Sequence, residues 1–369
     1  MGELFPSDEV ERGRRYHRPR YLSQLAEFVL SLALLAALAF TGIGDALLPD
    51  WPWWAQALVF PAVVLLVLQL AALPLVYWRG YAHERQWGLT TQTRGGWAVD
   101  VLKGFAVGAV LSTVLFLGFV ALARATEHWV WLAAPLAGLA VVFLTFIAPV
   151  VLEPIFNRFE PLPDEALADD LRALSVRAGV PVRDVLVADA SRRTTKSNAY
   201  VSGFGATRRV VVYDTLLRRA EPAELRAVLA HELAHRKHRD VLAFSVIAVV
   251  AAMLTVLLLR AVLGDDARDP RSFPLILFVL TLLQPPLVAV VAAISRRWEY
   301  RADRFALRVT RDLRALEAAF RGLVAANVAD LEPPRLVYYL RYTHPTVPER
   351  LRALRAAATI ELLQGQEAK

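Results

Sequence analysis

The sequence predicts a mainly α-helical, polytopic membrane protein with about six transmembrane helices and a smaller soluble part of mixed α and β structure. Hydrophobic residues make up 56% of the 369 residues, and the mean hydropathy is +0.40. This composition is too apolar for an ordinary soluble enzyme, and the excess lies in long runs. The chain contains no cysteine, which excludes disulfides, thiolate metal sites and a cysteine nucleophile.

Apolar runs long enough to cross about 30 Å of hydrocarbon define the expected helices. The basic first twenty residues lead into the first run without a small-residue cleavage site, so we expect a retained helix rather than a signal peptide. We expect an N-terminal membrane domain at 1–152 with four helices, and a second domain at 153–369 with two more. The runs lie at about 22–40, 55–76, 102–122, 130–152, 241–263 and 273–294.

The basic residues predict the orientation in the membrane. Loop 41–54 carries no Lys or Arg, and three aspartates offset two arginines in loop 264–272. The positive-inside rule therefore places both termini and the segment between the fourth and fifth runs on the cytoplasmic side. The net charge of +7 suits anionic lipid headgroups, so we expect the lipid bilayer, and not nucleic acid, as a partner. Arginine greatly outnumbers lysine, as in GC-rich genomes, which favours a bacterial cell membrane.

Residues 153–240 have the composition of a soluble domain. Leucines at 167, 171 and 174 form a helical stripe that Gly179 could end. DVLVADA predicts a short strand, and AYVSGF and RRVVVYD predict a hairpin joined by a turn at 205–207. A hairpin strand beside a metal site could receive an extended peptide by strand addition, or it could only pack on a helix. The final segment, 295–369, is predicted to be helical.

The segment AVLAHELAHRKHRD carries His231, Glu232 and His235 in the order HExxH. Pro222 suits a first helical turn and an apolar stripe follows it, so we expect the motif on a packed helix. Residues four apart share one face of a helix, so the two imidazoles could bind one metal ion. Glu232 could then take a proton from a water at that ion. This arrangement is typical of a zinc hydrolase, although the same pattern also occurs on ordinary solvated helices.

A catalytic zinc ion needs a third protein ligand and an open position. His238 would lie about 10 Å along the helix from His231, too far to share one ion. Glu299 is the better candidate, because it follows the sixth run as the HExxH helix precedes the fifth. A hairpin of these two runs would return Glu299 to the same face, where Asp303 could hydrogen-bond a ligating imidazole. The alternative is a salt-bridged helix surface, since four arginines surround both acids.

Several segments together resemble a known family. HELAH, SRRWEYRADRFA, SNAYVSGF and HPTVPERL, with ERQWGLTTQT and EPIFNRFEPLPD in the N-terminal half, are similar to the type I CAAX prenyl endopeptidases. These are membrane zinc proteases related to the a-factor converting enzyme and, more distantly, to heat-shock membrane metalloproteases of bacteria. The resemblance implies a membrane zinc metalloendopeptidase whose zincin-like α+β unit binds one zinc ion and is split by spans five and six.

The resemblance also implies roles for individual residues. It makes His231, His235 and Glu299 the zinc ligands and Glu232 the general base. Asp303 matches an acidic residue that is often assigned as a proton donor in the family. The spacing of Asp303 instead favours a contact with an imidazole.

Three further residues match the family's substrate-binding positions. Asn198 matches an asparagine that contacts the substrate backbone, and His344 and Arg350 match residues expected to stabilise the oxyanion or hold the peptide. Without the family, these residues would be interpreted as a turn residue, a cap before proline and a solvated charge.

The resemblance is incomplete in two respects. Eukaryotic members look like seven-span proteins that enclose a large intramembrane chamber, whereas this sequence predicts six spans, with the difference at the N-terminal end. CAAX prenylation is not expected in a bacterium. The expected substrate is therefore a peptide or a membrane protein, and the sequence does not decide whether it carries a lipid group. A quality-control protease is the second interpretation and an inactive membrane scaffold the third. A transporter is disfavoured, because the runs show few ionisable groups at mid-span.

Overall fold

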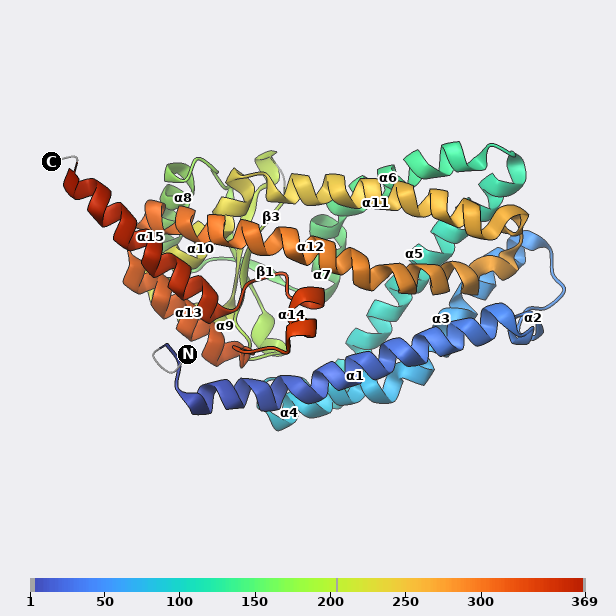
Figure 1. The fold of residues 1–369 in the computed structure, drawn as a ribbon, viewed down its shortest axis with the longest axis horizontal. Helices are drawn as coiled ribbons and strands as arrows, with labels where there is room; N and C mark the ends of the chain where they lie inside the picture. Colours follow the sequence, from blue (N-terminus) through green and yellow to red (C-terminus); the bar gives the residue numbers. More distant parts are fainter. Residues whose placement is uncertain (1–3, 204, 368–369) are drawn as a thin grey trace.

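The computed structural model describes residues 4–203 and 205–367. Long helices run side by side through one part of the molecule, and a small sheet with shorter helices forms the other part (Figure 1). The first long helix begins, and the last helix ends, on the side of the sheet. This arrangement confirms the predicted class, a mainly α-helical polytopic membrane protein.

Six segments among the described residues are long and apolar enough to cross a membrane, as the sequence predicts. Short π-helical turns follow two of the helices, at Trp78–Ala82 and Ala148–Leu152. The second turn contains Pro149, which lacks the N–H that a regular helical ladder needs. The long helices are α1 (Ser7–Phe40), α3 (Trp53–Tyr77), α5 (Arg94–Ala125), α6 (Trp129–Ile147), α11 (Asp240–Leu263) and α12 (Phe273–Thr310).

Two of these helices extend well beyond their apolar runs. Helix α1 begins at Ser7 rather than near 22, and its polar first half packs against the part that contains the sheet. Helix α12 continues past 294 to Thr310, because its polar extension carries buried side chains, Glu299 and Asp303 among them. Spans five and six pack with the other four: Phe60 and Trp129 share one apolar core with Val256 and Phe273.

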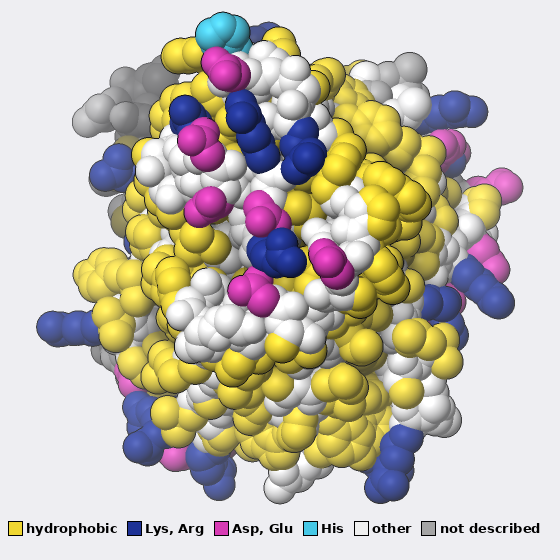
Figure 2. Space-filling view, turned by 90° about the vertical axis from the view of Figure 1, so that its right-hand side faces the viewer, with side chains coloured by type: hydrophobic (Ala, Val, Ile, Leu, Met, Phe, Trp, Pro, Cys, Tyr) yellow, Lys and Arg dark blue, Asp and Glu magenta, His cyan; other side chains and the backbone are white. Residues whose placement is uncertain are grey.

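Three connecting segments meet at the end opposite the sheet. Arg271 forms ion pairs with Asp45 (3.2 Å) and Asp269 (3.6 Å), and Arg124 donates a hydrogen bond to the carbonyl of Arg268. Figure 2 views this end of the molecule, where hydrophobic side chains surround a group of mixed charges. Because alternate connections lie at one end, successive spans run in opposite directions, as the predicted topology requires.

Within the described residues, the sheet has four strands in the order β1-β2-β4-β3. Strands β2 and β4 are parallel, and the other neighbouring pairs are antiparallel. The predicted strand and hairpin are present, with Gly205–Thr207 at the hairpin turn, whereas the sequence did not indicate β1. Strand β3 is an edge strand of this sheet. The strands are β1 (Phe159–Pro161), β2 (Asp184–Ala188), β3 (Ala199–Ser202) and β4 (Arg209–Tyr213).

Helices cover the sheet and complete the soluble core. As predicted, α8 (Glu165–Arg177) buries a leucine stripe, and Gly179 follows it in the left-handed conformation at φ +69°. Strand β4, α8 and the extension of α12 share the core with α10 (Pro222–Lys237), α13 (Leu313–Asn327), α15 (Val347–Glu367) and Leu216 of α9 (Asp214–Leu217). The other short helices are α2 (Ile43–Ala46), at the end of the molecule away from the sheet (Figure 1), α4 (His83–Gln86), α7 (Glu153–Phe156) and α14 (Arg335–Arg341).

A buried polar group joins the membrane helices to the sheet. Glu84 of α4 accepts a hydrogen bond from the Tyr16 hydroxyl of α1 and pairs with Arg20. Its other oxygen lies 2.8 Å from the ammonium of Lys196, in the segment that leads into β3. Residues 89–91 also bond to residues 193–195 through the backbone. The membrane part therefore fixes the start of the edge strand.

A close helix contact gives a stability prediction. Gly13 of α1 lies so near the Ala329 carbonyl that a methyl group would stand 2.4 Å from its oxygen. Gly13→Ala should therefore destabilise the protein by about 1–3 kcal/mol, the usual cost of overpacking, and lower Tm in detergent. Gly104→Ala in α5 is the control, since the space there is open. Equal Tm values for Gly13→Ala and wild type would contradict this packing.

Candidate metal centre

Helix α10 presents the two histidines of the HExxH motif on one face. Pro222 opens the helix and its apolar side packs into the soluble core, as the sequence predicts. His231 and His235 are one turn apart, and their Nε2 atoms lie 3.3 Å from each other. The packed helix thus presents two imidazole nitrogens that converge on one point.

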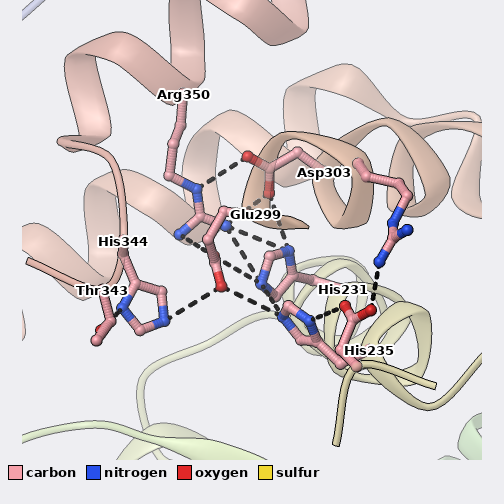
Figure 3. A network of polar contacts seen from close by, with 9 residues as sticks. His231, His235, Glu299, Asp303, Thr343, His344 and Arg350 are labelled. Atoms are coloured by element: carbon pink, nitrogen blue, oxygen red, sulfur yellow. Dashed lines mark hydrogen bonds and ion pairs between the residues drawn. The ribbon is translucent and has the colours of Figure 1, made fainter. Parts of the chain in front are cut away.

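Glu299 of α12 reaches the same point from the opposite side. Its Oε2 lies 3.3 Å from Nε2 of His231, and its Oε1 lies 3.4 Å from Nε2 of His235 (Figure 3). The side chain is only 2% exposed. One ligand atom from each of the three residues falls within 4.8 Å of the others, so the group could hold a metal ion. The hairpin of α11 and α12 therefore brings the predicted third acid to the histidines.

A carboxylate holds the second nitrogen of each imidazole. Nδ1 of His231 donates to Oδ1 of Asp303 at 2.9 Å, and Nδ1 of His235 donates to Oδ2 of Asp240 at 2.9 Å. These hydrogen bonds leave both Nε2 atoms to face Glu299. Sequence reasoning did not single out Asp240. The available signal was an acid five residues after His235, at the start of an apolar run.

The donor set fits a divalent metal such as zinc. Oε2 of Glu299 is buried and accepts no hydrogen bond among the described residues, although Nε2 of His231 and Nη1 of Arg350 lie at ion-pair distance, so a cation could still bind this oxygen. Two nitrogens bound at about 2.0–2.1 Å to a tetrahedral ion lie about 3.3–3.4 Å apart. The two Nε2 atoms already have this separation. Two imidazoles and one carboxylate also leave a fourth position open.

Arg350 packs against the cluster, with Nη2 at 3.2 Å from Nδ1 and 3.3 Å from Nε2 of His231. Its guanidinium makes a bidentate contact with Asp303, at 2.9 Å and 2.6 Å, and Nη1 lies 3.4 Å from Oε2 of Glu299 (Figure 3). The side chain is buried and stacks at 4.3 Å on the Phe320 ring. It therefore offsets the two buried carboxylates, and it does not line the cavity beside them.

The electrostatics of the motif suit metal binding and proton transfer. Without a bound cation, burial and the Arg350 guanidinium lower the pKa of His231, whereas hydrogen bonds to Asp303 and Glu299 raise it, and the net value is about 10. A cation on this imidazole would thus take the place of a proton. Burial raises the pKa of the Glu232 carboxyl, and the imidazoles of His231 and His235 oppose this shift.

A cavity of about 330 Å³ opens beside the cluster. Glu232, His235 and Glu299 line its polar side together with His344, whose Nε2 lies 3.4 Å from Oε1 of Glu299. The His344 side chain is 60% exposed and lies in the loop before α15. The other wall is mostly apolar and comes from β3, α11 and α12, through Val201, Val241, Phe244 and Val291.

Two other sequence candidates lie away from the cluster. Asn198 is exposed directly before β3 and does not line the cavity, although Tyr200 of that strand does. His238 follows the last residue of α10 and packs its ring against Phe305, at 5.6 Å between centroids. Strand β3 contacts α10, where Arg236 donates a hydrogen bond to the Val201 carbonyl, and it is also an edge strand of the sheet. The fold is thus compatible both with packing of this strand on a helix and with addition of a peptide strand.

Known families match almost the whole chain. The model described as peptidase family M48 matches residues 161–358, more than half of the sequence. This chain belongs to peptidase family M48. Residues 2–158 match a second model, described as the CAAX prenyl protease N-terminal region with five membrane helices. Within that range the described residues contain four candidate spans. The protein is thus a membrane metalloprotease of the CAAX prenyl protease-like family, as the sequence motifs predict.

Individual relatives agree with this assignment. An uncharacterized metalloprotease, YhfN of Bacillus subtilis (strain 168), is 30% identical over 80% of this chain and 72% of its own length. CAAX prenyl protease 1 of Saccharomyces cerevisiae is 28% identical over 81% of this chain and 72% of its own. The crystal structure of S. mikatae Ste24p matches with a TM-score of 0.80 at 23% identity, covering 95% of this chain and 90% of that one. The last match shows that the M48 chain shares that fold.

Proposed function

We propose that this M48 peptidase is a zinc metalloendopeptidase of the HExxH type that hydrolyses peptide bonds near the cytoplasmic face of a membrane. One observation carries the proposal. His231 and His235 converge with Glu299 on one point, and Glu232 lines the cavity beside it. In this proposal the first three residues bind one zinc ion, and Glu232 is the general base.

When bound, zinc would polarise the scissile carbonyl and lower the pKa of a water. Glu232 takes a proton from the attacking water and passes it to the leaving amine. Burial raises the pKa of the Glu232 carboxyl, which makes its carboxylate a stronger base for taking that proton. Asp303 and Asp240 keep the two imidazoles in the tautomer that turns Nε2 toward the ion.

The remaining candidate residues act on the substrate or support the ligands. His344 borders the cavity beside Glu299, where it can donate to the developing oxyanion. Arg350 holds Asp303 in place and balances the charge of Glu299. Asn198 binds the substrate backbone at the beginning of β3. An extended peptide adds to the free edge of β3, beside Tyr200 and Val201.

The substrate is a peptide or a membrane protein, with or without a lipid group. Relatives named CAAX prenyl proteases support a lipidated peptide, and the six spans support access from the bilayer. The distribution of basic residues supports both termini in the cytoplasm, and the excess of arginine over lysine supports a bacterial cell membrane. We place an N-terminal membrane domain at 1–152 and the metallopeptidase domain at 153–369. Two family models that meet near residue 160 support this division.

Zinc content and peptide cleavage test the proposal together. Purified protein should bind one zinc ion per chain and cleave at least one of two quenched peptides, a farnesylated CAAX peptide and the same peptide without lipid. Chelation should abolish cleavage, and added zinc should restore it. The ratio of the two rates measures how strongly the lipid is selected. Failure to bind zinc, or cleavage that survives complete removal of zinc, would contradict the zinc enzyme.

A further inference from the structure

We infer that Asp240 is a positioning residue for His235, and that Arg301 holds Asp240 in the orientation this requires. The inference rests on the proposed function, because it takes His235 as a metal ligand. Asp240 belongs to the lining of the cavity, but side chains bind both of its carboxylate oxygens. It acts through the imidazole alone, by a hydrogen bond from Nδ1 to Oδ2 at 2.9 Å.

The chain reversal after the HExxH helix creates this contact. Helix α10 ends at Lys237, and Arg239 takes a left-handed conformation with φ 60°. The turn sends the chain into α11, whose first residue is Asp240. Asp240 therefore comes back against the last turn of α10, where His235 lies. A helix that simply continued past Lys237 would carry an acid at this position away from His235, because five residues correspond to about 500° of rotation.

Both oxygens of Asp240 are engaged. One accepts from His235, and the other pairs with the guanidinium of Arg301 on α12. The carboxylate is only 3% exposed, so water competes little for either contact. A carboxylate with both oxygens bound cannot rotate without breaking one bond. Arg301 therefore fixes the direction from which Asp240 meets the imidazole.

Helix α12 consequently holds His235 from two sides. Glu299 faces Nε2 directly, and Arg301, two residues later, acts on Nδ1 through Asp240. The other imidazole has an equivalent arrangement, because Asp303 and Arg350 form a carboxylate–arginine pair behind His231. The pair behind His235 differs in one respect. It joins the first turn of span five to the end of span six, so the membrane hairpin orients a metal ligand.

Zinc affinity of the full-length protein tests the inference, measured by competition with a chelator. Asp240→Asn should raise the Kd for zinc by about 10- to 100-fold, as loss of a carboxylate behind a ligating histidine does. Arg301→Gln should raise it by about threefold, because the pair is part-exposed. The controls are Asp170→Asn and Arg226→Gln, which break a similar ion pair between α8 and α10 away from the cluster. Both controls should bind zinc as the wild type does.

Two further readouts separate positioning from a general loss of structure. Before zinc is added, both Asp240→Asn and Asp170→Asn should be folded at the assay temperature, with a lower Tm for Asp240→Asn because Asp240 is the more buried residue. At saturating zinc, KM for the cleaved peptide should match wild type. Should Asp240→Asn fail to fold, Asp240→Glu takes its place; its longer side chain retains the charge but misplaces the oxygens, so Kd should still rise.

An unchanged Kd in Asp240→Asn, with wild type that binds zinc and cleaves peptide, would overturn the positioning role and leave the enzyme intact. If Arg301→Gln alone leaves Kd unchanged, the part assigned to Arg301 is overturned. A wild-type protein that binds no zinc would instead refute the function on which the inference rests.

Discussion

Glu232→Gln should reduce peptide hydrolysis by about 10²- to 10⁴-fold at saturating zinc, the usual contribution of a general base. Glutamine has nearly the same size and can still fill the cavity wall, but its amide cannot accept a proton from water. Since Glu232 does not belong to the convergent group of ligand atoms, zinc binding should persist. The measurement is kcat for the peptide that the wild type cleaves, with zinc content determined on the same sample.

Glu224→Gln is the matched control for this variant. It makes the same chemical change in the first turn of the same helix, away from the cavity. Its kcat should equal that of the wild type. A zinc-loaded Glu232→Gln protein with normal kcat would show that a different group takes the proton.

Glu299→Gln should weaken zinc binding by on the order of 10²- to 10³-fold. Four-ligand zinc sites contribute about 10–16 kcal/mol in total, so one ligand accounts for a few kcal/mol. The change also removes a buried negative charge that faces Arg350 and both imidazoles. The positive charge of Arg350 is then less well offset, and it repels the zinc ion more strongly. Chelator competition measures the Kd, and hydrolysis should fall with zinc occupancy.

Glu317→Gln is the control for the weaker zinc binding expected of Glu299→Gln. Glu317 lies on α13 and pairs with Arg355 outside the metal centre, so its replacement should leave the Kd for zinc unchanged. Zinc bound as tightly by Glu299→Gln as by wild type would exclude Glu299 as the third ligand. Asp303 would then be the next acid to test, because it contacts the same imidazole.

Much of the membrane part was predictable, because span length and hydropathy are local properties of the chain. All six apolar runs became helices, and the leucine stripe of α8 and the β3–β4 hairpin followed their periodicity. The ends of the helices were less predictable. Polar residues extend α1 back to Ser7 and α12 forward to Thr310, because distant segments bury those polar faces.

The candidate site also has features that the sequence predicts and features that depend on tertiary structure. The HExxH spacing gives the pair of histidines on one helical turn, and the position of Glu299 after the sixth run suggests the third acid. The partners of Nδ1 depend on tertiary structure. Asp240 meets His235 only because Arg239 reverses the chain, and Arg350 reaches Asp303 from 47 residues away.

The sequence by itself determined the membrane class, the number of spans and the motif residues of a metalloprotease, since each depends on composition or on spacing within one segment. Tertiary structure decided which carboxylate orients which imidazole, that Arg350 contacts Asp303 and Glu299 from outside the cavity, and that the edge strand β3 borders that cavity. Those features arise where separate helices and strands meet, and hydrogen bonds between distant residues leave no periodic signal in the chain.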